Sequence, residues 1–231
     1  IRQAAHLEEN FGEPELAARF IRLARRTAEA AEVFWDDERG LYSNRRARET
    51  FSEHAQAYAV LSGLIPRPHL PRVKKGLVDD GSLTRATDPF THYLFEAFVR
   101  LGLRNHIWPR LQRGFTPDSL GLLTTPEGPE PTRSDCHAWG AHPHYHLFAS
   151  LLGLRPAAPG FQRVRIDPLW DLLQDVSGQL PHPDGPICFH LSCAHGKPEG
   201  EVTLPPTVTG TLVYPDGELA LRAGTTLLTG R

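Results

Sequence analysis

A segment of sixteen residues, 131–146, concentrates side chains that can bind a polar ligand. It contains an arginine, an aspartate, four histidines and a tryptophan, and it directly follows the acidic loop TTPEGPE at 124–130. A buried helix or strand does not need this mixture. A carbohydrate site does, because sugar hydroxyls need polar partners and the C–H face of a sugar packs on an indole. Chemistry is therefore expected first in this segment.

Several of these side chains also have purely structural interpretations. Arg133 and Asp135 could contact substrate, or they could hold the loop and Glu127 in place, since an Arg–Asp pair beside a helix start is often a clamp. His137 could hydrogen-bond a sugar hydroxyl. Trp139 could stack on a sugar ring or pack between helices. The residue types leave both interpretations open.

The three remaining histidines, at positions 142, 144 and 146, alternate along the chain. On a strand they would share one face, whereas on a helix His142 would pair with His146. Either arrangement offers at most two or three metal ligands. We expect no metal site here and no cofactor.

Composition sets the class of protein. With 231 residues the chain can form one large domain or two modest ones. A formal net charge of -2 gives no basic surface for nucleic acid or an anionic membrane. No apolar run approaches the roughly 20 residues that span a bilayer. The first ten residues lack the pattern of a signal peptide.

The cysteines and the chain start support two further expectations. Cys136, Cys188 and Cys193 match no zinc or redox spacing, so we expect reduced thiols and a cytoplasmic location. A chain that begins with Ile1 and contains no methionine is expected to be an internal fragment. If methionines were omitted from the sequence, some spacings would be short by one residue.

The elements that must position the polar segment fall into two groups. Helical periodicity with capping signals precedes residue 156 and predicts helices over 15–34, 52–64, 69–77, 89–101, 105–113 and 145–152. After residue 156 the chain shows short alternating runs, which predict strands at 164–166, 187–193, 201–204, 211–214, 218–222 and 225–228. Asp-Gly pairs at 184–185 and 216–217 are typical of hairpin turns. A small antiparallel β-sandwich is the simplest interpretation of these strands.

Four sequence blocks carry a family resemblance: FSEHAQAYAVLSGL at 51–64, DPFTHYLFEAFVRLGL at 88–103, TTPEGPEPTRSDCHAWGAHP at 124–143 and LLGLRPAAPGFQRVRIDP at 151–168. Together they resemble the C-terminal part of a bacterial α-L-rhamnosidase. The resemblance implies a multidomain fold, α then β. Residues 1–156 would form the second half of an (α/α)6 toroid of the six-hairpin glycosidase type, and residues 157–231 a β-sandwich domain. The first half of the toroid would lie outside this chain.

The resemblance also implies a mechanism, that of an inverting glycosidase with one acid and one base. The general base would be Glu127, although the family pattern has one more residue between Thr125 and the glutamate. A register shift would make Glu130 the base instead. The general acid would lie in the missing half of the barrel. We therefore expect the chain alone to bind sugar weakly and to hydrolyse nothing.

Further residues acquire roles from the same resemblance. His137 and Trp139 would hold the sugar, and Arg133, Asp135 and His92 would contribute to substrate binding. His54 could also reach the mouth of the barrel. The expected partner is a rhamnose-containing glycoside, with no nucleic acid and no membrane, and the oligomeric state is not specified.

Two acidic stretches need no functional interpretation. The acidic run at 36–38 is interpreted as a solvated turn, and the run at 79–81 as a turn signal.

Two other functions fit the same residues. One is a different (α/α)6 glycosidase or polysaccharide-processing enzyme, which the fit of the pocket to a 6-deoxy sugar would distinguish. The other is a non-catalytic carbohydrate-binding or scaffold module in which Glu127 is only a loop acid.

Overall fold

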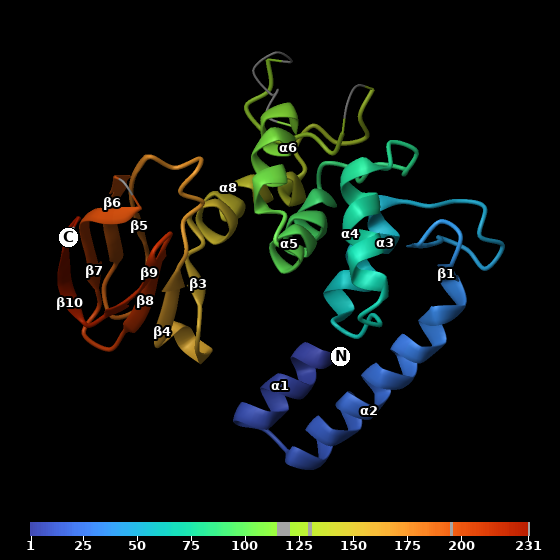
Figure 1. The fold of residues 1–231 in the computed structure, drawn as a ribbon, viewed down its shortest axis with the longest axis horizontal. Coiled ribbons are helices and arrows are strands. Elements are labelled where there is room, and N and C mark those ends of the chain that lie inside the picture. Colours follow the sequence, from blue (N-terminus) through green and yellow to red (C-terminus); the bar gives the residue numbers. More distant parts are fainter. Residues whose placement is uncertain (115–120, 129–130, 195, 231) are drawn as a thin grey trace. The chain divides into compact units, whose positions relative to one another are not determined.

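The computed structural model describes residues 1–114, 121–128, 131–194 and 196–230 (Figure 1). The chain separates into two compact units. The first consists of Ile1–Leu103 with Glu127–Arg133, and the second of Arg104–Pro126 with Ser134–Arg231. Residues 104–126 thus group with the strands, whereas the sequence places a domain boundary at residue 156. That boundary remains a proposal.

The first unit is mainly helical. Its helices are α1 (Arg2–Phe11), α2 (Pro14–Ala31), α3 (Glu53–Ser62), α4 (His69–Asp79) and α5 (Thr91–Leu101). A 3-10 turn, η1 (Glu32–Phe34), and a small hairpin of β1 (Trp35–Asp36) and β2 (Leu41–Tyr42) follow α2. The predicted helix over 15–34 therefore ends at Ala31, because its last residues tighten into η1 before the hairpin.

Capping residues begin and end the helices of this unit largely where the sequence indicates. The Ser52 side chain accepts a hydrogen bond from the Ala55 backbone N–H at 3.3 Å, which caps α3. Gly63, with a φ of 64°, ends the same helix in the left-handed conformation. Helix α5 begins at Thr91, two residues after the predicted Pro89, and ends at Gly102.

The acidic run at 36–38 begins at Asp36, the last residue of β1, and continues into the turn before β2. Asp36 accepts a hydrogen bond from the Arg39 backbone N–H at 2.8 Å, and Asp37 accepts one from the Trp35 indole at 2.7 Å. The carboxylates of Asp36 and Asp37 thus have local structural partners.

The hairpin is also held by buried Gln56 of α3, which bonds both the N–H and the C=O of Tyr42.

The second unit contains helical segments and all the longer strands. Its helical segments are η2 (Arg104–His106), α6 (Ile107–Gly114), η3 (Ala138–Ala141), α8 (His142–His146) and η4 (Leu147–Leu152). The predicted helix over 145–152 is thus split, and its second part, η4, is a π-helix that ends at Gly153 with a φ of 70°. π-Helices are rare and frequently occur at functional sites.

The strands form two four-stranded sheets of order β10-β7-β6-β5 and β3-β4-β8-β9. Their bounds are β3 (Arg155–Pro156), β4 (Arg163–Ile166), β5 (Asp175–Leu180), β6 (Ile187–Ala194), β7 (Lys197–Leu204), β8 (Thr209–Tyr214), β9 (Gly217–Leu221) and β10 (Gly224–Thr229). Both sheets contribute to one hydrophobic core, which includes Ile166 of β4, Leu191 of β6 and Leu212 of β8. Helices followed by two sheets with a shared core are therefore the observed architecture.

The prediction of purely antiparallel pairing is corrected in one place. The sheet of β5, β6, β7 and β10 is antiparallel throughout, but β4 and β8 pair in parallel, with Val164 opposite Gly210. The reason is connectivity: the chain passes through three strands of the other sheet between β4 and β8, a crossover long enough for parallel pairing. Strand β5 was not predicted, because Gly178 interrupts its short alternation.

Two further observations bear on the sequence predictions. The three cysteines are unpaired. None of the helices in the described part of the chain combines the length and the apolar character that a membrane-spanning helix requires.

Candidate functional site

Glu127 is held by the arginine that follows it in the same loop. Arg133 donates from Nε to Glu127 Oε2 at 2.9 Å, and from Nη2 to Glu127 Oε1. Paired, parallel bonds of this kind fix a carboxylate in one orientation. The Glu127 side chain is 28% exposed and that of Arg133 is 83% exposed, so water can reach the pair. The competing candidate, Glu130, lies outside the described residues.

Hydrogen bonds between the two flanks of the acidic loop close its base. Thr124 Oγ1 donates to the Asp135 carbonyl at 2.5 Å, and Thr125 Oγ1 donates to the His137 carbonyl at 2.9 Å. The His137 backbone N–H returns a bond to the Thr125 carbonyl at 2.7 Å. The two threonines therefore position the polar segment through its backbone. The Asp135 side chain is exposed, and the carboxylate that Arg133 contacts is that of Glu127.

A glycine permits the close approach beside Trp139. Gly140 is buried, and a Cβ at this position would lie 3.0 Å from Thr125 Cβ and 3.2 Å from the Pro126 carbonyl oxygen. Trp139 precedes it in the 3-10 turn η3 and is 53% exposed. This exposure leaves part of the indole available for a ligand. It fits stacking on a sugar ring better than core packing between helices.

The three alternating histidines lie on a helix, so they do not share one face. His142 and His146 of α8 are four residues apart, with ring centroids separated by 5.4 Å, whereas His144 is exposed. His146 is fully buried, and its Nδ1 lies 2.8 Å from Ser150 Oγ. Arg155 Nη2 donates to the same hydroxyl at 3.1 Å. An arginine can only donate, so Ser150 accepts from Arg155, and its hydroxyl also bonds His146 Nδ1.

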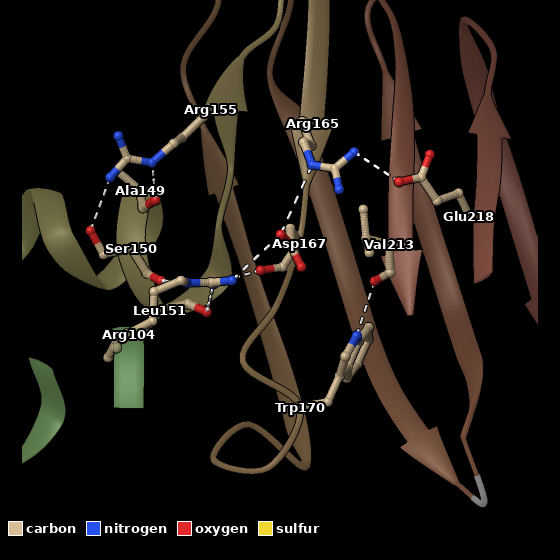
Figure 2. Close-up of polar contacts among 10 residues, drawn as sticks. All are labelled: Arg104, Ala149, Ser150, Leu151, Arg155, Arg165, Asp167, Trp170, Val213 and Glu218. Atoms are coloured by element: carbon tan, nitrogen blue, oxygen red, sulfur yellow. Dashed lines mark hydrogen bonds and ion pairs between the residues drawn. The ribbon is translucent and has the colours of Figure 1, made fainter. Parts of the chain in front are cut away.

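Two arginines hold the end of η4, and Figure 2 shows both pointing at its last turn. Arg104 donates to the carbonyls of Ser150 at 2.8 Å, Leu151 at 3.1 Å and Asp167 at 2.6 Å. Arg155 Nε donates to the Ala149 carbonyl at 2.6 Å. The last carbonyls of a helix lack partners within the helix, so these donors replace the missing ones. Burial lowers the pKa of Arg104, and the Asp167 carboxylate, 3.5 Å away, opposes that shift.

Sequence reasoning did not identify Arg104, Ser150 and Arg155 as functional or structural contacts. Arg155 could have been found, because a donor directly after a helix that ends in glycine often bonds the last carbonyls. Arg104 lies 46 residues before Ser150, so no local pattern reveals its contact with that residue.

In the first unit, the structure connects His54 and His92 through aromatic rings at the start of α3 and α5. The His54 ring lies 4.1 Å from that of Phe90, Phe90 lies 5.1 Å from Tyr93, and Tyr93 lies 5.2 Å from His92. Burial lowers the pKa of His54, and the charge of Glu53 acts in the opposite direction. Both histidines are partly buried and lie at helix starts.

Comparison with known proteins identifies relatives of one kind. Residues 153–227 match the family described as the bacterial alpha-L-rhamnosidase C-terminal domain. The chain is similar to the GH78 family rhamnosidase of Bacillus sp. GL1, with a TM-score of 0.80 and 24% identity over 94% of this chain. It is also similar to α-L-rhamnosidases from Dictyoglumus thermophilum (TM-score 0.77, 12% identity over 97% of this chain) and Streptomyces avermitilis (0.74, 15%, 96%), the latter solved with L-rhamnose. A search of curated proteins finds no match.

These likenesses concern the fold along nearly the whole chain, because all three identities are below 25%. The chain spans 25% of the length of the Bacillus and Streptomyces proteins and 30% of the Dictyoglumus protein. The family match is confined to 153–227, a region that begins at the glycine ending η4 and contains most of both sheets.

Proposed function

We propose that this chain, whose residues 153–227 match the bacterial α-L-rhamnosidase C-terminal domain, is part of a glycoside hydrolase that removes terminal α-L-rhamnosyl residues. The observation that carries this proposal is the combination of that family match with a rhamnosidase-like fold over at least 94% of the chain. The substrate is a rhamnose-containing glycoside. One of the structural neighbours was solved with L-rhamnose bound, which is consistent with this choice.

The architecture follows the same proposal. The helices of residues 1–156 form the second half of an (α/α)6 toroid, and residues 157–231 form a β-sandwich domain. The shared core of the two sheets supports the sandwich, since residues such as Phe189 and Val202 of one sheet and Leu221 of the other belong to one buried cluster. The preceding half of the toroid belongs to the part of the protein outside this chain.

The reaction is hydrolysis with inversion. Glu127 accepts a proton from a water molecule, the water oxygen attacks the anomeric carbon, and the glycosidic C–O bond breaks without a covalent enzyme intermediate. The leaving oxygen takes its proton from a carboxylic acid in the other half of the toroid. The contribution of this chain is therefore the base and part of the sugar-binding surface, and alone it hydrolyses nothing.

The pair with Arg133 supports the assignment of Glu127 as the base. A general base must be ionised, oriented and accessible to one water, and the two bonds from Arg133 orient the carboxylate while 28% of its side chain stays exposed. His137 then donates to or accepts from a sugar hydroxyl, and Trp139 stacks on the ring. Asp135 and His92 complete the polar contacts.

The test is Glu127→Gln in the complete protein, assayed on an aryl α-L-rhamnoside. This change keeps the shape of the side chain and removes its basicity, so kcat should fall by about 100-fold to 10,000-fold. Proton NMR of the first-formed sugar should show the β anomer in the wild type, because inversion converts the α linkage into β-L-rhamnose.

The matched control is Glu49→Gln, which alters an exposed glutamate in the first unit and should leave kcat unchanged. Turnover within a few-fold of wild type in Glu127→Gln would move the base to another residue, first to Glu130. A complete protein that binds rhamnose but hydrolyses no rhamnoside would favour the non-catalytic carbohydrate-binding alternative.

A further inference from the structure

The β-sheet part of the second unit contains a hollow of about 510 Å³. Its walls come from three connections, those between β3 and β4, between β5 and β6, and between β7 and β8. The polar side chains that line it are Gln162, Arg163, His182, Asp184 and Thr207. This volume is in the range of sites that bind small molecules.

A short hydrogen-bonded chain organises one side of the hollow. Thr207 Oγ1 donates to Asp184 Oδ2, and the Asp184 backbone N–H donates to His182 Nδ1 at 3.2 Å. Because His182 Nδ1 accepts, the hydrogen of the neutral ring lies on Nε2. Nε2 is shielded from solvent and has no hydrogen-bond partner in the described part of the chain.

On the other side, two donors remain available. Arg163 donates from Nη2 to the Ala157 carbonyl at 3.3 Å, and within the described ranges no carboxylate lies in salt-bridge distance of its guanidinium. The Gln162 side chain makes no hydrogen bond with any described residue, whereas its backbone carbonyl accepts from the Thr209 N–H at 3.1 Å. A guanidinium and a carboxamide thus face solvent beside the hollow.

The backbone that carries these donors is in an unusual conformation. Gly160 and Phe161 have φ values of 66° and 56°, and a positive φ is rare for phenylalanine. The Phe161 side chain packs against the core that both sheets share, which holds the turn in place. The donors at 162 and 163 therefore follow a fixed turn, and a fixed wall reduces the entropy lost on binding.

The chemistry of the lining selects the class of ligand. Arg163 and Asp184 carry opposite charges, so this pair gives the lining no net charge that would select an anion over a neutral ligand. The apolar groups are small, namely Ala158, Gly160 and Pro183, so a large apolar ligand would bury little surface. What remains is a set of donors and acceptors at short range, which matches the hydroxyl groups of a sugar.

We propose that this hollow on the β-sheet part of the chain is a binding site for neutral saccharide units. The sugar would accept hydrogen bonds from Gln162 and Arg163 and donate one to Asp184. The existence of the site rests on the contacts above, whereas the expectation that a rhamnose-containing saccharide occupies it rests on the proposed function. Such a site would hold a glycan to the protein independently of bond cleavage.

Titration of the 231-residue chain with L-rhamnose, D-glucose and D-galactose, followed by NMR chemical shifts, tests this inference. At least one sugar should bind with a millimolar Kd, measurable up to about 50 mM. Arg163→Ala and Gln162→Ala should each raise that Kd at least tenfold. Arg222→Ala, which removes an exposed arginine that does not line the hollow, should leave it unchanged. Both test positions are exposed, and thermal melts of each variant verify that it is folded.

The possible outcomes separate this site from the proposed function. If no sugar binds, or if Glu127→Gln abolishes binding and Arg163→Ala does not, the inference is overturned. Tighter binding of inorganic phosphate than of any sugar would also overturn it. If binding depends on Arg163 while the complete protein cleaves no aryl rhamnoside, the saccharide site stands and the proposed hydrolase activity fails. Conversely, Arg163→Ala in an active complete protein should leave kcat on a small aryl rhamnoside unchanged.

Discussion

Two arginine–carboxylate contacts in this chain lie in opposite environments. Arg133, which pairs with Glu127, is 83% exposed, and that carboxylate is its partner in the loop. Arg104, which pairs with Asp167, is only 16% exposed and also donates to three backbone carbonyls. The first pair orients a carboxylate at the surface, whereas the second joins the end of η4 to the residue that follows β4. Similar groups therefore lie in contrasting settings, and we propose a functional role only for the exposed pair.

The energetic difference follows from burial. An exposed ion pair contributes about 0–1 kcal/mol, because water and salt screen it and two side chains lose freedom. Removing a donor from buried carbonyls costs about 1–3 kcal/mol for each acceptor left unsatisfied. Arg104 donates to the carbonyls of Ser150, Leu151 and Asp167 at once. Its loss should therefore lower the free energy of unfolding several-fold more than the loss of Arg133.

The largest effect is expected for Arg104→Met. The change keeps much of the side-chain volume but removes the Arg104 donor from the carbonyls of Ser150 and Asp167 and one of two donors from the carbonyl of Leu151, which also accepts from the Leu169 N–H. We expect the free energy of unfolding to fall by about 3 kcal/mol or more. Urea denaturation of the chain, followed by far-UV circular dichroism, measures this loss. Arg104→Lys should recover only part of it, since an ammonium cannot reach all the acceptors together.

Arg165 is the natural control for this prediction, because Figure 2 shows it beside the same carboxylate. It lies 3.9 Å from Asp167 and 3.0 Å from Glu218, and its side chain is 45% exposed. Arg165→Met should cost less than about 1 kcal/mol. Equal losses for the two variants would show that burial does not distinguish these arginines.

The parts of the fold that the sequence predicts are those whose signals are local. Ser52 and Gly63 mark the ends of α3, and alternation marks β6 and β8, so these elements lie close to their predicted positions. Strand β5 was missed because its half-buried residues alternate around Gly178, which packs under the Phe189 ring of the neighbouring strand. The parallel pairing of β4 and β8 depends on chain connectivity, which no local window contains.

In the candidate site, too, residue types are visible in the sequence, whereas contacts that depend on the backbone conformation are not. The residue types of 131–146 indicate a polar ligand site, whereas Glu127, with Glu130 as its alternative, was proposed from the family resemblance, and the roles of Glu127, His137 and Trp139 remain predictions. The bond from Arg133 to Glu127 rather than to Asp135 is set by the loop conformation. The Arg155–Ser150–His146 chain depends on a π-helix, and its extra residue per turn is not apparent from spacing.

A smaller effect on stability but a large one on turnover is expected for Arg133→Met. The exposed pair contributes little to folding, so the free energy of unfolding should change by less than about 1 kcal/mol. If Arg133 positions the base, kcat of the complete protein should fall at least tenfold while KM changes little. Arg133→Lys should restore part of kcat. A fall in stability comparable to that of Arg104→Met would remove the contrast between the two arginines.

The smallest effect concerns His54, a partly buried histidine at the start of α3. Burial lowers the pKa of His54, so the folded state favours the neutral ring. Below the unfolded value of about 6.5, the unfolded chain then binds more protons than the folded chain, and the free energy of unfolding falls as the pH decreases. His54→Gln should therefore lose less stability than the wild type between pH 7.5 and pH 5.5, measured as the shift in the urea midpoint. His6→Gln, at a histidine whose side chain is 67% exposed, should leave the wild-type shift unchanged. A wild-type shift that persists in His54→Gln would assign the pH dependence to other histidines, and it would show that partial burial at the start of α3 is not sufficient to couple ionisation to folding.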